Sequence, residues 1–190
     1  AMAEEGRFDP IIGRDEEIDQ VMLILLQRSR KNACMLAPAG VGKTALVAGL
    51  AQAIVADRVP NYLKGAQILE LDMPAMAAGT NSPGEFQDRF IPICRGLAER
   101  YHHYDLPRYV MFIDEIHTIM PTAKGSAYAG LSEVMKPYMT VGDLHILGAT
   151  TLDEFRMYVA IDPALDRRFQ KVNLRMPTAD ETITILKGVR

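Results

Sequence analysis

The sequence predicts an α/β fold in which helices flank a parallel five-stranded sheet on both faces. Short apolar segments alternate with segments of helical period along the 190 residues, and this alternation is typical of parallel strands joined by crossover helices. Residues suited to phosphate and metal chemistry follow two of the apolar segments. Ligands of such sheets bind at the carboxyl ends of the strands, so the segments that predict the fold also predict where its site lies.

Five segments of strand length are expected to form the sheet: 33–36, 67–71, 109–113, 144–149 and 170–174. Helical period predicts helices at 15–28, 44–56, 85–101, 126–139 and 152–160, and a further helix that begins near Ala179. Asp15 is expected to cap the first of these helices. Pro83 and Gly84 interrupt the chain just before the helix at 85–101.

The composition disfavours several classes of protein. Hydrophobic residues make up 48% of the chain and charged residues 24%, as in an ordinary globular domain. The formal net charge of -3 gives no bulk attraction to nucleic acid, and no apolar run approaches the ~20 residues that span a bilayer. We therefore expect no nucleic-acid partner and no membrane insertion. Cys34 lies in an apolar segment, so a buried free thiol and a cytoplasmic location are expected.

The segment 37–44 reads Ala-Pro-Ala-Gly-Val-Gly-Lys-Thr and follows an apolar strand. It fits the phosphate-binding fingerprint G-x-x-x-x-G-K-[ST] except at the first position. In that fingerprint the glycine-rich backbone directs N–H groups at phosphate oxygens, Lys43 supplies charge at the β- and γ-phosphates, and Thr44 binds Mg²⁺. The residues expected to hold the nucleotide here are Ala39, Gly40, Val41, Gly42, Lys43, Thr44 and Ala45. The fold is therefore predicted to be a P-loop NTPase.

Ala37 stands where the fingerprint has its first glycine. An alanine held at positive φ costs about 1–2 kcal/mol, whereas at negative φ it costs little. Because Gly40, Gly42 and Lys43 are retained, ATP binding is expected to survive, and the effect on affinity stays open.

A second element of the site is the acidic pair Asp114-Glu115, which follows the apolar residues 111–113. In a Walker B site the first carboxylate belongs to the magnesium shell, and the second orients and polarises the attacking water. An acidic turn after a strand is a common structural alternative. The pair follows Gly42-Lys43-Thr44 by ~70 residues in an alternating α/β pattern, and together the two motifs predict a site for a nucleoside triphosphate.

Two further segments have both a functional and a structural interpretation. Thr151 follows the fourth expected strand, where its hydroxyl could bind the γ-phosphate or the attacking water; it also begins a capping box with Glu154, and the two roles are compatible. Arg167 and Arg168 precede the fifth strand, either as surface charges paired with Asp166 or as an arginine finger for a neighbouring subunit. The finger requires an oligomer.

Several of these motifs belong to longer segments that resemble the first ATPase domain of Clp-type AAA+ unfoldases and disaggregases. The segments that carry the resemblance are 8–18, 42–45, 49–51, 112–118, 148–155 and 166–170. The resemblance implies an AAA+ large subdomain in which Ile11, Ile12 and Gly13 line the adenine pocket. It further implies that Thr151 senses the γ-phosphate and that Arg167 and Arg168 act across a ring interface.

The same resemblance implies a Mg²⁺-dependent ATPase coupled to protein unfolding or disaggregation. The implied cofactors are ATP and Mg²⁺, and the implied partners are other copies of the chain in a hexameric ring, protein substrates, and an adaptor or protease. Residues 1–177 are expected to form the large α/β subdomain, with 1–6 leading into it and 1–2 a candidate tag remnant. Residues 178–190 are expected to begin a truncated helical lid, so slow hydrolysis and a monomeric state are expected for the chain alone.

The segment 80–86 departs from this family. It reads Thr-Asn-Ser-Pro-Gly-Glu-Phe, with Ser82 in place of the aromatic residue that grips polypeptide in the central channel and Pro83 in place of a basic residue. Either another domain grips the substrate, or the chain is a nucleotide-responsive ring-assembly module that does not thread polypeptide. A third hypothesis, a nucleic-acid AAA+ motor, is disfavoured by the acidic charge balance and by the Clp-type segments.

Overall fold

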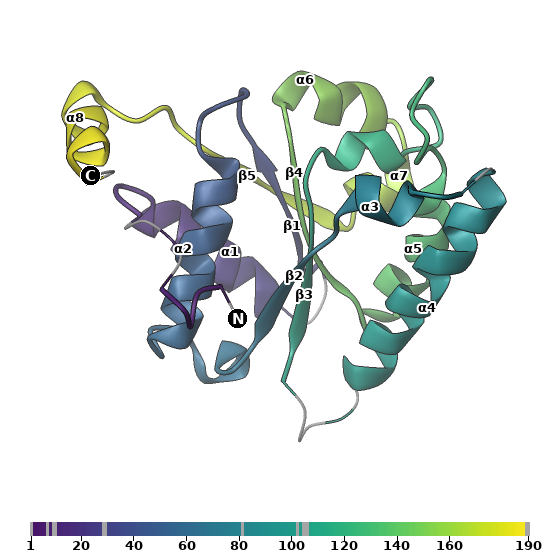
Figure 1. Ribbon diagram of the computed structural model, residues 1–190, viewed down its shortest axis with the longest axis horizontal. Helices are drawn as coiled ribbons and strands as arrows, with labels where there is room; N and C mark the ends of the chain where they lie inside the picture. The colour runs from purple at the N-terminus through teal and green to yellow at the C-terminus, as the bar shows by residue number, and fades with distance from the viewer. Residues whose placement is uncertain are drawn as a thin grey trace.

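The computed structural model describes residues 2–6, 8, 11–27, 30–80, 82–101, 103 and 107–188. Ala1, the residues Asp9 and Pro10 of the segment 8–18, and Asn81 of the segment 80–86 lie outside this set. The described part of the chain forms one α/β sandwich around a central sheet (Figure 1). Among these residues, no helix combines the length and the apolar character needed to cross a lipid bilayer.

The sheet has five strands, all paired in parallel, in the order β2-β3-β4-β1-β5. The strands are β1 (Asn32–Leu36), β2 (Gln67–Glu70), β3 (Tyr109–Ile113), β4 (His145–Thr150) and β5 (Phe169–Asn173). Leu36 is in register with Thr150 of β4 and Asn173 of β5. The carboxyl ends of β1, β4 and β5 therefore lie at the same edge of the sheet. Parallel sheets bind their ligands at this edge.

Helices cover both faces of this sheet (Figure 1). The helices α1 (Asp15–Leu25) and α2 (Lys43–Val55) lie on one face, and α4 (Pro83–Tyr101) and α5 (Leu131–Val141) lie on the other. Shorter elements are η1 (Asn61–Leu63), α3 (Met73–Ala77), η2 (Ile116–Ile119), α6 (Leu152–Glu154), the π-helix η3 (Phe155–Val159) and α7 (Pro163–Asp166). The last helix, α8 (Ala179–Gly188), lies apart from the sheet, beyond α2.

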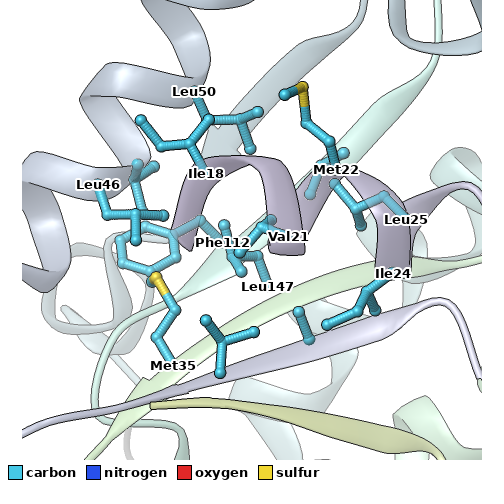
Figure 2. Close-up of a cluster of buried hydrophobic side chains, with 14 of the residues drawn as sticks. Ile18, Val21, Met22, Ile24, Leu25, Met35, Leu46, Leu50, Phe112 and Leu147 are labelled. Carbon is cyan, nitrogen blue, oxygen red and sulfur yellow. The ribbon is translucent and has the colours of Figure 1, made fainter. Parts of the chain in front are cut away.

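Two hydrophobic cores lie on opposite faces of the sheet because successive strand residues point in opposite directions. On one face, Met35, Phe112 and Leu147 meet side chains of α1 and α2 (Figure 2). On the other face, residues adjacent to these in the strands pack against α4 and α5. The strand residues of this second core are Cys34, Leu36, Met111, Ile113, Ile146 and Phe169, and its largest helix residues are Phe86, Phe90 and Phe155.

The structure confirms the predicted α/β class and all five predicted strands, with end shifts of one residue. The helix expected at 126–139 begins only at Leu131, because Gly130 adopts φ 90° at its N-cap and residues 126–130 form turns. The first helix ends at Leu25 instead of residue 28. Asp15 is its first residue, not its cap, and Arg14 at the N-cap makes no side-chain capping bond. The division into subdomains 1–177 and 178–190 stays a prediction.

Candidate nucleotide-binding and catalytic site

The glycine-rich loop connects the carboxyl end of β1 to the first turn of α2. Gly40 (φ 79°) and Gly42 (φ 101°) hold left-handed conformations, which side chains disfavour, and a Cβ added at Gly40 would meet no atom within 4 Å. Helix α2 begins at Lys43 without a side-chain cap at Gly42. Its first N–H groups therefore lack intrahelical partners and favour an anion, so the predicted residues Ala39 to Ala45 form a loop that fits a phosphate chain.

Ala37 extends the sheet and is not strained. Its main-chain N–H donates to the carbonyl of Thr150 at 3.2 Å, which continues the pairing of β1 with β4. Among the described non-glycine residues, positive φ occurs at Arg30, Asp57 and Glu115. Ala37 therefore needs no glycine, and this departure from the fingerprint carries no backbone penalty.

The loop lysine and the second acidic residue lie together at this edge. Lys43 is only 8% exposed, and its Nζ lies 3.7 Å from Oε1 of Glu115. Glu115 has φ 48°, a conformation that costs a non-glycine residue of order 1–3 kcal/mol and is frequent at functional sites. Asp114 accepts the main-chain N–H of Glu115 at 2.9 Å. The structure thus brings together residues that are 72 positions apart in the chain (43 and 115).

The two oxygen-bearing side chains predicted to bind metal, Thr44 and Asp114, are both exposed at this end of the molecule. A hydroxyl and a carboxylate are hard oxygen ligands of the kind that Mg²⁺ prefers. Helix α2 places Thr44 next to Lys43, and the end of β3 places Asp114 next to Glu115. The donor set therefore fits a magnesium ion carried by nucleotide phosphates.

Thr151 begins a network that the sequence analysis only partly foresaw. It is the N-cap of α6, and the capping box with Glu154 is formed in both directions, which confirms the helix-cap interpretation. Oε2 of Glu154 accepts hydrogen bonds from the Thr151 hydroxyl (2.8 Å), the Thr151 N–H (3.0 Å) and the Thr150 hydroxyl (2.9 Å). Partial burial opposes ionisation of Glu154, but these hydrogen bonds outweigh it and hold the pKa of Glu154 below its ordinary value.

His117 joins this network from the element that follows the acidic pair. Its Nδ1 lies 2.9 Å from Oγ1 of Thr150, 3.5 Å from Glu115 and 3.4 Å from Glu154. Ligand atoms of Glu115, His117 and Glu154 all lie within 4.8 Å of one another. A resident metal is disfavoured there because Lys43 already approaches Glu115. His117 falls within the segment 112–118 that carries the family resemblance, but its contacts could not be foreseen because they depend on β4 lying beside β3.

The residues predicted to line the adenine pocket lie beside α2 and α8. Ile11 contacts α2 at Gly49, where an added Cβ would come within 3.2 Å of the Ile11 side chain. Gly13 has φ 71°, and its carbonyl accepts from Arg175 at 3.3 Å. Arg175 also forms two 2.6 Å hydrogen bonds to Glu181 of α8, which lower the pKa of Glu181 to about 2. Ile12 lies between these anchored positions and is half-buried.

Arg14 is a buried residue to which the sequence analysis gave no role. It is 6% exposed and donates to Glu17 (3.0 Å), to the main-chain oxygen of Arg175 (2.8 Å) and to the main-chain oxygen of Val41. One guanidinium thereby joins α1, the phosphate loop and the segment that leads to α8. Its position directly before an acidic helix start is the only local signal in the sequence.

Arg167 and Arg168 lie at the opposite edge of the sheet, before the first residue of β5. Arg168 donates to the carbonyl of Ala164 (2.7 Å) and to the hydroxyl of Thr140 (2.9 Å). Arg167 is exposed; its main-chain oxygen accepts from Arg30, and its guanidinium forms no hydrogen bond or ion pair with the described part of the chain. Asp166 pairs with Lys171 at 3.3 Å, so the interpretation that it pairs with the arginines is not supported.

These two arginines border a cavity of about 680 Å³ at the amino end of β1 and β5. Arg30 and Lys31 add positive charge to its lining, and Asp162 adds a carboxylate that pairs with Lys136 at 2.5 Å. The five residues of β1 separate this edge from the phosphate loop by about 17 Å at ~3.3 Å per residue. Neither arginine therefore serves the phosphate loop of its own chain.

Ser82 lies directly before α4, whose first residues, from Pro83 on, belong to the segment 80–86. The hydroxyl of Ser82 accepts the main-chain N–H of Glu85 at 3.3 Å, which is an N-terminal capping contact. Arg89 donates to the carbonyls of Met76 (2.9 Å) and Ala78 (2.7 Å). Ser82 therefore caps its own helix, and Arg89 of that helix binds the end of α3.

A parallel sheet in the order β2-β3-β4-β1-β5, with a glycine-rich loop, a buried lysine and an acidic pair at its carboxyl edge, defines a nucleotide-binding protein of the P-loop class. Residues 33–175 match the family described as "ATPase family associated with various cellular activities (AAA)". The chain belongs to this AAA family.

Similar proteins carry more specific names. The chain is 44% identical over 188 residues to the chaperone protein ClpB of Vibrio cholerae. This match covers 99% of the present chain and 21% of that protein. It is 42% identical over 189 residues to the chloroplastic chaperone protein ClpC1 of Arabidopsis thaliana, covering 100% of this chain and 20% of that protein. The structure of the S. cerevisiae Hsp104:casein complex in its extended conformation matches with TM-score 0.82 and 38% identity, covering 99% of this chain and 31% of that one. The chain thus spans about a fifth of the length of these curated relatives.

Proposed function

We propose that the chain binds and hydrolyses ATP with Mg²⁺ as part of a larger Clp-type chaperone that unfolds, disaggregates or remodels proteins. The observation that carries the proposal is the approach of Lys43 Nζ to Glu115 Oε1, 3.7 Å apart, directly above the unstrained phosphate loop. Phosphoryl transfer requires a cation that binds the phosphates and a group that orients the attacking water, and Lys43 and Glu115 are placed side by side for these two roles. The likeness to proteins named as chaperones supports the coupling to protein remodelling.

Each predicted residue has a role in this proposal. The N–H groups of Ala39 to Ala45 and the Lys43 ammonium hold the phosphates, and Ile11, Ile12 and Gly13 contact the adenine. Thr44 and Asp114 hold Mg²⁺, which when bound neutralises charge on the phosphates. Glu115 orients and polarises the attacking water. Thr151 turns its hydroxyl from Glu154 (2.8 Å) to the γ-phosphate or the water.

Arg167 supplies the positive charge that the site of a neighbouring copy needs during phosphoryl transfer. Its distance from its own phosphate loop, about 17 Å along β1, supports action between chains, and the exposure of its side chain supports access. We therefore include assembly into a ring, hexameric in the full protein, with Arg168 as a support of Arg167. The chain alone is expected to be a monomer that hydrolyses ATP slowly, since no neighbour completes its site.

The partners in this proposal are other copies of the chain and protein substrates, with an adaptor or protease as a further partner. The Hsp104 structure that resembles this chain is described as a complex with casein, which supports a polypeptide substrate. The net charge of -3 supports the absence of a nucleic-acid partner. A cytoplasmic location is supported by two free, buried cysteines, Cys34 and Cys94; burial raises the pKa of the Cys94 thiol to about 12.

The substitution Glu115→Gln in the assembled full-length protein tests the proposal. The amide keeps the size of the side chain but cannot polarise water, so ATP binding is expected to persist and turnover to fall by about 100-fold or more. Equilibrium binding of a fluorescent ATP analogue and steady-state phosphate release measure the two quantities. Turnover at the wild-type rate in this variant would remove Glu115 from its role.

A second candidate function rests on Ser82. Its hydroxyl oxygen caps α4 and it carries no aromatic ring, so this position offers little side-chain surface that could grip a translocating chain, as a ring-assembly module without threading would require. The variant Ser82→Tyr separates the two functions in an assay that follows unfolding of a tagged substrate. Unfolding by the wild-type protein, unchanged in the variant, favours the remodelling function over the module.

A further inference from the structure

His117 occupies a position between the two ends of the catalytic site. It lies in η2, two residues after Glu115, and its ring packs against Tyr158 with centroids 5.6 Å apart and an interplanar angle of 32°. The side chain is 16% exposed, so packing restrains the ring. From this position Nδ1 faces three oxygen atoms: Oγ1 of Thr150 at 2.9 Å, Oε2 of Glu154 at 3.4 Å and Oε2 of Glu115 at 3.5 Å.

The hydrogen bonds of Thr150 determine which ring nitrogen carries hydrogen. Thr150 is fully buried, so its hydroxyl has no solvent partner. Its single hydrogen is donated to Glu154 at 2.9 Å, so its oxygen can only accept from Nδ1. His117 therefore carries hydrogen on Nδ1 and donates it to Thr150, while the positive end of this N–H dipole faces carboxylate oxygens of Glu154 at 3.4 Å and Glu115 at 3.5 Å.

That donor offsets a repulsion between carboxylates. Carboxylate oxygens of Glu115 and Glu154 lie within 4.8 Å of each other and of the His117 nitrogen, and two like charges at this separation repel. Glu115 is half-exposed, and among the described residues its cationic neighbour is Lys43 at 3.7 Å. Without the Nδ1–H group, the Glu115 carboxylate would turn away from Glu154 toward solvent.

The same glutamate holds the hydroxyl of Thr151. Oε2 of Glu154 accepts from the Thr151 hydroxyl at 2.8 Å, from its N–H at 3.0 Å and from the Thr150 hydroxyl at 2.9 Å. When the Thr151 hydroxyl donates instead to a phosphate oxygen, Glu154 loses one of these three donors. The charge of Glu154 is then less compensated, so its attraction to the Nδ1–H dipole of His117, which also faces Glu115, becomes stronger.

We infer that His117 is a positioning residue for hydrolysis: the dipole of its Nδ1–H group, which donates to Thr150, attracts the Glu115 carboxylate and links its placement to Thr151 through Thr150 and Glu154. The inference rests on the proposed function, because it takes Glu115 as the water-orienting group. It explains why a histidine with its donor nitrogen toward the acidic pair is packed against Tyr158 at this site.

The variants of position 117 that test this role differ in where they place a donor. Asn places its amide nitrogen near the position of Nδ1, Gln reaches toward the position of Nε2, and Leu offers no donor. In the assembled full-length protein, His117→Gln and His117→Leu are expected to lower kcat about tenfold or more, because small misplacements of a catalytic group have large effects. KM and ATP affinity should stay within about twofold, and His117→Asn should retain kcat within about threefold.

The exposed residue His103 provides the matched control, and His103→Gln should leave kcat unchanged. Melting temperatures show which variants fold. If those at position 117 do not, Glu154→Gln tests the link alone, with an expected loss of kcat at constant KM. In a background of Glu154→Gln, His117→Gln should lower kcat no further, since both act through one contact.

Wild-type turnover by His117→Leu, or a loss in His117→Asn equal to that in His117→Leu, would overturn the inference. So would wild-type turnover by Glu154→Gln, or multiplying effects in the double variant. These outcomes can be distinguished from a failure of the proposed function. The proposed function fails if the Glu115→Gln protein still hydrolyses ATP. An inactive Glu115→Gln protein beside a fully active His117→Leu protein would contradict only the role of His117.

Discussion

Nε of Arg30 donates a 2.7 Å hydrogen bond to the main-chain oxygen of Arg167, 137 residues further along the chain. Gln170 in turn donates to the main-chain oxygen of Arg30 at 2.9 Å. The backbone of Arg167 is thereby fixed while its guanidinium stays exposed. Arg168 differs, because its guanidinium is bound to Ala164 and Thr140. The structure therefore separates two neighbouring arginines that the sequence alone left equivalent.

This separation predicts different consequences for the two arginines. Arg167→Ala in the assembled protein should lower ATP turnover by roughly 10²-fold or more, as loss of an arginine finger does, with ATP affinity and melting temperature nearly unchanged. Arg168→Ala should lower the melting temperature by a few degrees through loss of two hydrogen bonds and lower turnover less. Steady-state kinetics and thermal melts measure both, and the reverse ranking of turnover would refute this assignment.

Mixed rings test whether Arg167 acts between chains. A protein with Arg167→Ala retains Glu115, and one with Glu115→Gln retains Arg167, so a mixture contains interfaces with both groups intact. Turnover in the mixture should exceed that of either variant alone. A mixture as inactive as its components, with assembly verified by light scattering, would speak against action across an interface.

Ala37→Gly is expected to leave ATP affinity within about twofold. Ala37 does not have positive φ, so glycine relieves no strain there, and the added backbone freedom should lower stability by roughly 0.4–1 kcal/mol. Titration with a fluorescent ATP analogue and urea unfolding measure the two effects. A large gain in affinity would show that the alanine restricts the loop.

Arg14→Met should destabilise the chain by about 3–5 kcal/mol, because it leaves the buried carboxylate of Glu17 without its 3.0 Å partner. ATP affinity should also fall, since the carbonyl of Val41 in the phosphate loop loses a donor. The double variant Arg14→Met with Glu17→Leu removes the unpaired charge and should recover part of the stability but not the affinity. Urea unfolding and nucleotide titration distinguish these effects, and equal stability of wild type and single variant would contradict the role of Arg14.

The stability of the chain should fall as pH falls below about 6.5, and His145 should account for part of that fall. Burial, with the nearby charges of Lys31 and Arg108, lowers the pKa of His145 to about 3. The unfolded state takes up a proton near pH 6.5 whereas the folded state does not, so acid favours unfolding. Between pH 7.5 and 5.5 this one group contributes a loss of about 1.4 kcal/mol.

The variant His145→Gln isolates this contribution to the pH dependence. Its overall stability should be lower, but its free energy of unfolding should change less between pH 7.5 and 5.5 than that of the wild type, by the same ~1.4 kcal/mol. Urea unfolding at a series of pH values provides the comparison. Identical slopes in the two proteins would show that His145 is not held neutral by the fold.

The sheet and the centre of the site could be predicted because their signals are local. Apolar segments such as 109–113 and the fingerprint around Lys43 depend on neighbouring residues in sequence, and parallel pairing then brings Lys43 to Glu115. The roles of Arg14 and His117 could not be predicted, because their partners come from other elements, up to 161 residues away. The helix start at Leu131 was missed for a similar reason, since it is determined by the left-handed conformation of Gly130.

Arg175 binds the carbonyl of Gly13 and the carboxylate of Glu181 with one guanidinium. Helix α8 and the turn before α1 are therefore connected, although Gly13 and Arg175 are 162 positions apart in the chain. A rotation of α8 must either break these hydrogen bonds or move the turn at Gly13, together with the neighbouring Ile11 and Ile12. Movement of α8 outside the sheet would therefore change the wall of the proposed base pocket, and Arg14, which binds both Arg175 and Val41, would transmit that movement to the phosphate loop.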